Sequence, residues 1–130
     1  MELHITLVSA ALAAVINLWL SVRCGRARVK GKVLHGDGGD ATLMKAMRAH
    51  ANFIEYTPIA LILIAAIELS GHGGALLAGT AIAFLFGRII HALGMASDQT
   101  NWLRGGGMLL TFLPMIGLAV TAVMIAYDAL

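Results

Sequence analysis

The sequence predicts an all-α protein, an integral membrane four-helix bundle. Of its 130 residues, 59% are hydrophobic and 12% are charged, whereas charged residues make up roughly a quarter of an ordinary soluble domain. The mean hydropathy of +0.85 agrees with this imbalance. Because a spanning helix needs about 20 residues, the chain has room for about four crossings. We therefore expect a single membrane domain over residues 1–130.

The first transmembrane helix is predicted over residues 5–22. This apolar run ends at Arg23. A cleaved signal peptide would carry basic residues before its apolar stretch, but here Glu2 precedes the run and every Lys and Arg follows it. We therefore expect a membrane helix rather than a signal peptide. Asn17, inside the run, is expected to bond a neighbouring helix or, alternatively, to face a ligand cavity.

A long polar loop is predicted over residues 23–40, because this segment is rich in Gly and holds five of the nine Lys and Arg residues. Asp40 is a candidate N-cap for the second helix, with Thr42 as the alternative. That helix is predicted over residues 43–70. It is longer than the hydrocarbon thickness, so its first turns should project from the membrane or the helix should tilt. Pro58 lies inside it and should kink it.

The remaining helices are predicted over residues 75–96 and 104–127. A Gly-rich turn around His72 precedes the third helix, and a short polar connection with Trp102 precedes the fourth, which contains Pro114. Trp at such a connection is typical of the membrane interface. One long and two short connections favour a simple up-and-down bundle.

The distribution of cations predicts the orientation of the bundle. All nine Lys and Arg residues fall on the side that holds the first and third connections. By the positive-inside rule this side faces the cytosol and both termini face outward. The basic connection is also expected to contact anionic membrane lipids. The one cysteine, Cys24, lies in this segment and has no partner for an intrachain disulfide.

A charged stripe at the start of the second helix marks the candidate functional site. Arg48, Asn52 and Glu55 are spaced i, i+4 and i+7, so they share one helix face. Charged groups are costly in hydrocarbon unless neighbouring helices satisfy them. The other helices are therefore expected to bring polar groups to the same depth.

Three residues of the last two helices fall in that layer. Arg88 and His91 are spaced i and i+3 on the third helix, and Arg104 opens the fourth. The layer then holds three Arg against one Glu, and a buried surplus of positive charge requires an anionic ligand or water. Three Gly follow Arg104 and allow close approach at a helix N-terminus, where free N–H groups favour anions. The alternative is that the cluster only fixes helix packing.

No motif of a soluble enzyme competes with this interpretation. The chain has no Cys pair, no phosphate loop and no metal-binding His spacing, so we expect no metal site and no nucleic-acid partner. His50 and His72 are expected at the membrane interface rather than in a ligand set. Glu68 and Asp128 are expected to be solvated helix ends.

These residues form a recognisable pattern. The second helix carries Arg48-Ala49-His50-x-Asn52-x-x-Glu55-x-x-Pro58, the third carries Arg88-x-x-His91, and Arg104 stands ten residues before Pro114. This pattern, which extends over nearly the whole chain, resembles the MAPEG family, the membrane-associated proteins in eicosanoid and glutathione metabolism. The Gly-Asp-Gly-Gly-Asp stretch before the second helix resembles the bacterial branch in particular.

The resemblance implies a homotrimer in a bacterial inner membrane, with its termini in the periplasm and glutathione bound between adjacent subunits in the cytosolic leaflet. Arg104 would be the catalytic residue, standing near the sulfur and lowering the pKa of the thiol. The implied glutathione-binding residues come from the first three helices: Arg26 or Arg28, Arg48, Asn52, Glu55, Arg88 and His91.

Four positions depart from the family pattern. Ala51 stands where members with eicosanoid chemistry often have Arg, Met95 and Met108 stand where they have Tyr, and Gly105 stands where Ser is frequent. Binding of glutathione is therefore expected more firmly than its turnover.

The predicted function is a membrane-bound glutathione-binding protein that acts as a glutathione transferase or peroxidase on a lipophilic substrate arriving through the bilayer. The alternative is a noncatalytic trimeric scaffold with a vestigial pocket. A small proton-coupled exporter is a more distant alternative, because such proteins need an acidic residue in the first helix, and this helix has none.

Overall fold

The computed structural model describes residues 3–130 and consists of four long helices and one π-helical turn. The helices are α1 (His4–Gly31), α2 (Ala41–Ile67), α3 (Ala75–Gly94) and α4 (Trp102–Ala126), and the turn η1 (Glu68–His72) continues α2. The described residues contain no strand. Each long helix is long and apolar enough to cross a membrane. The predicted all-α membrane bundle is therefore confirmed.

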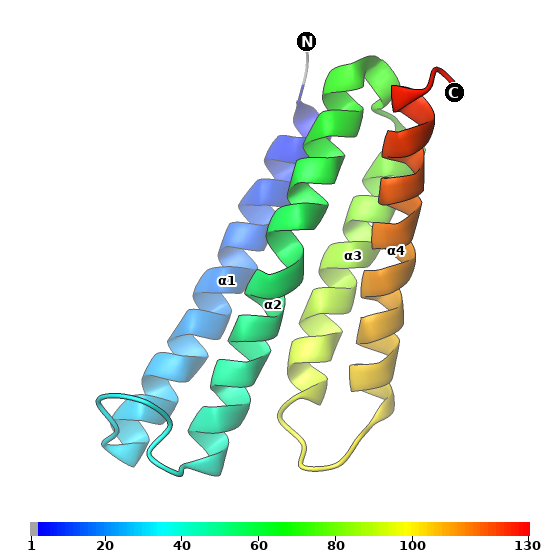
Figure 1. The fold of residues 1–130 in the computed structure, drawn as a ribbon. Coiled ribbons are helices and arrows are strands. Elements are labelled where there is room, and N and C mark those ends of the chain that lie inside the picture. Colours follow the sequence, from blue (N-terminus) through cyan, green and yellow to red (C-terminus); the bar gives the residue numbers. More distant parts are fainter. Residues whose placement is uncertain (1–2) are drawn as a thin grey trace.

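Consecutive helices run antiparallel, so the N- and C-termini lie together at one end of the bundle (Figure 1). The α1–α2 and α3–α4 connections lie together at the opposite end (Figure 1). All nine Lys and Arg residues belong to the helical turns and the connection that meet there. We call it the basic end. α1 packs mainly on α2, and α3 packs mainly on α4.

The prediction for the first helix was wrong at its C-terminal end, because α1 continues to Gly31 instead of ending at residue 22. Arg, Lys and Ala are good helix formers, and cations in the last turn interact favourably with the helix dipole. Lys32 ends the helix in the left-handed conformation, with φ of 53°. The Val33 N–H then bonds the Arg28 carbonyl at 3.0 Å, as in a Schellman cap.

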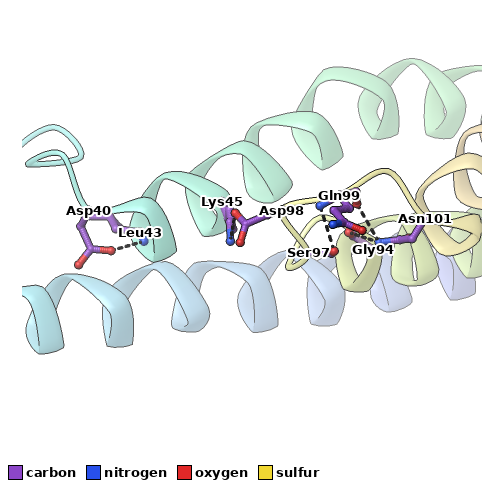
Figure 2. A network of polar contacts seen from close by, with 8 residues as sticks. All are labelled: Asp40, Leu43, Lys45, Gly94, Ser97, Asp98, Gln99 and Asn101. Carbon is purple, nitrogen blue, oxygen red and sulfur yellow. Dashed lines mark hydrogen bonds and ion pairs between the residues drawn. The ribbon is translucent and has the colours of Figure 1, made fainter.

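The other helix ends lie close to their predicted positions, and two of them are capped by side chains. The Asp40 carboxylate accepts a hydrogen bond from the Leu43 N–H at 2.9 Å, so the predicted N-cap of α2 is confirmed (Figure 2). Asn101 caps α4 in the same way, and its amide group donates to the Gly94 carbonyl at 3.0 Å (Figure 2). One side chain therefore joins the end of α3 to the start of α4.

Glu68 is not the solvated helix end that the sequence predicted. It is buried, and its carboxylate accepts hydrogen bonds from the Ile5 N–H at 2.8 Å, the Thr6 N–H at 2.7 Å and the Thr6 hydroxyl at 2.6 Å. A carboxylate suits this place because the first N–H groups of a helix lack internal partners and attract negative charge. Glu68 therefore fastens the end of α2 to the start of α1.

Glycine residues bring α3 and α4 into close contact. A Cβ atom on Gly107 would lie 2.5 Å from the Cβ of His91, and one on Gly94 would lie 2.5 Å from the backbone nitrogen of Arg104. Small residues at helix interfaces allow backbones to approach in this way in membranes. The start of α4 is consequently held directly against the segment of α3 that carries Arg88 and His91.

We predict that Gly87→Ala destabilises the bundle, whereas Gly79→Ala on the same helix does not. A Cβ on Gly87 would lie 2.6 Å from the Cβ of Leu110, and a Cβ on Gly79 would meet no atom within 4 Å. Overpacking of this kind costs about 1–3 kcal/mol. Unfolding of both variants in mixed micelles measures the difference. Equal stability of the two variants would show that α3 and α4 are not packed this tightly.

Candidate functional site

Arg88 is the most deeply buried charged side chain of the described residues, with 1% of its surface exposed. Its Nη1 donates a hydrogen bond to the Oδ1 of Asn52 at 2.8 Å. Its Nε and Nη2 are buried and have no partner within residues 3–130. Since buried donors are nearly always hydrogen-bonded, these two nitrogens need an acceptor that the single chain does not supply.

An aromatic ring supports the guanidinium group. The guanidinium carbon of Arg88 lies 5.5 Å from the centre of the Tyr56 ring, a distance suited to a cation–π interaction. Tyr56 packs edge-on against Phe112 of α4, with ring centres 5.8 Å apart. Tyr56 was not among the predicted site residues, although its i+4 spacing from Asn52 places both on one face of α2.

His91 lies one turn after Arg88 on α3 and is also buried, with 4% exposure. Gly107 of α4 approaches its backbone and Cβ closely, so His91 lies at the contact between α3 and α4. The structure therefore brings Arg88, Asn52 and His91 inside the bundle, near its basic end.

Three other predicted site residues lie on the outside of the single chain. Arg48 and Glu55 of α2 and Arg104 of α4 are all exposed. Among the described residues, the recorded ion pair joins Lys45 to Asp98 and involves none of the three. A single chain therefore encloses only part of the predicted site.

The two candidates from the first helix also differ in their surroundings. Arg28 donates from Nη1 to the Gly36 carbonyl at 2.7 Å, so it braces the α1–α2 connection. Arg26 is exposed and lines a cleft between α1 and α2 at the basic end. Of the two, Arg26 is the one that remains available to a ligand.

His50 joins two membrane helices. Its Nε2 lies 2.8 Å from the Oδ1 of Asn17 on α1, and an amide oxygen can only accept, so the ring donates. The expectation that Asn17 bonds a neighbouring helix is thereby confirmed. This bond links α1 to the turn of α2 that carries Arg48 and Asn52.

An apolar groove of about 460 Å³ lies between α1 and α2. It begins one turn from the Arg88 site, since Phe53 and Thr57 of α2 line it. The hydroxyl oxygen of Thr57 is buried and has no hydrogen-bond partner in the described part of the chain. A mostly apolar groove whose lining also includes the polar residues Asn17 and Thr57 suits a lipophilic ligand that carries a hydrogen-bonding group.

Comparison with known proteins identifies the family. The model of the MAPEG family matches residues 6–124. The chain belongs to the MAPEG family. The matched range reaches from the first turn of α1 to the last turns of α4, and it includes each predicted site residue. The resemblance seen in the sequence is therefore confirmed.

The curated relatives of this MAPEG protein include the inner membrane protein YecN of Escherichia coli K12. The two sequences are 34% identical over 97 residues, which are 75% of this chain and 74% of the relative. The protein of the same name from Escherichia coli O6:H1 matches equally well. The relative's name gives its location in a membrane and no reaction.

We predict that Asn52→Leu costs about 2 kcal/mol of stability in the native protein, because it leaves the buried Arg88 cation without its hydrogen bond. In an Arg88→Met background the same change should cost less than about 1 kcal/mol, since no charge is left unpaired. A double-mutant cycle of unfolding free energies measures this coupling. Equal costs in the two backgrounds would contradict the buried pair.

Proposed function

We propose that this MAPEG protein binds glutathione, or a related low-molecular-weight thiol, and activates its sulfur as a thiolate for attack on a lipophilic substrate. The observation that carries the proposal is the Arg88 guanidinium, which is buried yet has two donor nitrogens without a partner in the described chain. A charged group left in this state inside a membrane protein marks a functional site, and an anion is the ligand it needs.

The charges around Arg88 match those of glutathione, which carries two carboxylates, one ammonium and, when activated, a thiolate. Arg88 and Arg48 would bind carboxylates, because guanidinium groups pair with them through two parallel hydrogen bonds. Glu55 would receive the ammonium group, and the Asn52 amide would bond the peptide. His91 would line the same pocket.

A homotrimer would complete the pocket. Glu55 lies about 10 Å further along α2 than Arg48, and both side chains are exposed on the single chain. A carboxylate facing lipid at that depth would be costly. An adjacent subunit covering this face of α2 would enclose Glu55 and Arg48 and place the thiol between subunits.

Arg104 would activate the sulfur. A guanidinium group beside a thiol stabilises the thiolate and lowers the thiol pKa. The thiolate would then form a bond to an electrophilic carbon while the leaving group takes the electron pair. Alternatively, it would form an S–O bond with one oxygen of a peroxide while the O–O bond breaks and the other oxygen leaves as an alkoxide. The substrate would enter from the bilayer, and the groove beside Thr57 provides a surface that suits it.

The basic end would face the cytosol in a bacterial inner membrane, with both termini in the periplasm. The positive-inside rule supports this orientation, because all nine Lys and Arg residues lie at one end of the bundle. The location also agrees with the name of the relative. Glutathione would then enter the pocket from the cytosol.

A trimeric scaffold without catalysis is the alternative, and the family positions occupied by methionine favour it. Met95 packs against the apolar core of the bundle, and a thioether cannot replace a tyrosine hydroxyl as a hydrogen-bond donor. A proton-coupled exporter is less suitable, since α1 contains no Asp or Glu.

We predict that glutathione added to the protein in nanodiscs near neutral pH gives a saturable ultraviolet thiolate absorbance. A free thiol has a pKa of about 8.5. Because Arg104 lowers this pKa, the absorbance of the bound thiol should rise at lower pH than that of free glutathione. Arg104→Ala should abolish the signal at neutral pH, and Arg104→Lys should retain part of it, because it keeps the positive charge.

The control for this titration is the fold of each variant, measured by circular dichroism and thermal unfolding. Loss of absorbance in folded Arg104→Ala supports thiol activation. If the folded native protein gives no thiolate signal, the transferase proposal fails and the scaffold becomes the better account.

A further inference from the structure

A second basic site lies at the basic end of the bundle, and Arg88 does not take part in it. It is a cleft of about 320 Å³ between α1, α2 and the segment that follows α3. None of Arg48, Asn52, Glu55, Arg88 and Arg104 lines it. Its cationic lining residues are Arg23, Arg26, Lys30 and Lys45.

The cleft depends on the helical extension of α1 that the sequence did not predict. Arg23, Arg26 and Lys30 are spaced i, i+3 and i+7, so the continued helix places all three on one face. Part of the opposite walls is formed by small side chains, Ala46 of α2 and Ala96 after α3. A rigid row of cations consequently faces an open space.

Little negative charge compensates these cations. Lys45 pairs with Asp98 of the α3–α4 connection, which holds this connection against α2 (Figure 2). No Asp or Glu lines the cleft. Arg26 and Lys30 make no ion pair among residues 3–130.

The position of Arg23 indicates where the cleft lies relative to the membrane. Its guanidinium carbon lies 5.2 Å from the centre of the Trp19 ring, and its Nη1 reaches the Ala92 carbonyl at 3.4 Å. It directly follows Val22, the last residue of the apolar run. The cleft therefore opens where hydrocarbon meets the headgroup layer.

We propose that this cleft binds the phosphate group of an anionic phospholipid. Phosphate oxygens accept several charge-assisted hydrogen bonds, which Arg and Lys side chains supply. Thr42 also lines the cleft, and its hydroxyl is a further donor. A lipid is the source because the site lies at the end of the apolar run, where headgroup phosphates are concentrated. This inference does not rest on thiol binding.

The intrinsic fluorescence of Trp19 can report occupation of the cleft. The protein has two tryptophans, and Trp102 is exposed, so Trp102→Phe leaves Trp19 beside Arg23 as the one emitter. A short-chain phosphatidylglycerol is titrated into this protein in zwitterionic micelles. We expect a saturable change in emission that weakens as salt is added. Phosphatidylcholine and glycerol phosphate serve as the zwitterionic and soluble comparisons.

Two variants that each remove one positive charge test whether the lipid binds in the cleft itself. Lys30→Gln changes a lining residue, whereas Lys32→Gly changes a residue outside the cleft whose positive φ suits glycine. Lys30 lines the cleft and would donate a charge-assisted hydrogen bond to the phosphate, and loss of such a bond lowers the affinity by about fivefold or more. We therefore expect Lys30→Gln to raise the dissociation constant about fivefold and Lys32→Gly to leave it unchanged.

Three other outcomes would contradict lipid binding in this cleft. Equal weakening by both variants would indicate the general surface potential and no defined cleft. Equal binding of glycerol phosphate would assign the cleft to a soluble anion, and displacement of the lipid by glutathione would make it part of the thiol pocket. The thiolate titration on Lys30→Gln separates the two proposals, since that variant should keep the thiolate signal while losing lipid affinity.

Discussion

The rest of the structure depends on the burial of one guanidinium group within a membrane bundle. Arg88 of α3 can lie there because Asn52 of α2 accepts one hydrogen bond and Tyr56 places its ring against the cation. Removing either support would leave a charge in a medium that solvates charges poorly. The position of α2 relative to α3 is thus coupled to this group, and two of its donors remain without an acceptor in the described chain.

The two ends of the bundle are stabilised by different means. At the end that holds the termini, the Glu68 carboxylate caps α1 and completes a structural joint. At the basic end, Asn101 and the close contact at Gly94 hold the start of α4 against α3. The backbone is fixed there, while the side chains of Arg26, Arg48 and Arg104 remain exposed. That combination suits a binding end, because rigid supports keep charged groups in place before the ligand arrives.

The sequence predicted the four helices, the Asp40 cap and the depth of the polar layer, because these follow from local hydropathy, cap chemistry and helix rise. It did not predict the extension of α1, since the end of an apolar run marks the edge of the hydrocarbon and not the end of a helix. The contacts of Glu68 with Thr6 join residues far apart in the chain, which no local pattern contains. The rise per residue of a helix predicts how far along the helix a residue lies, but not which way its side chain faces in the bundle. The exposure of Glu55 could therefore not be predicted.

The most direct test of the central claim follows the guanidinium of Arg88 itself. In protein with ¹⁵N-labelled arginine, the Nε resonances of the six arginines are recorded while glutathione is added, and Arg88→Lys identifies the resonance of interest. The account predicts that the Arg88 Nε signal shifts saturably, at the same glutathione concentration at which the thiolate forms. A thiolate that forms while the Arg88 signal stays unchanged would contradict the account, because the thiol would then bind away from the buried cation.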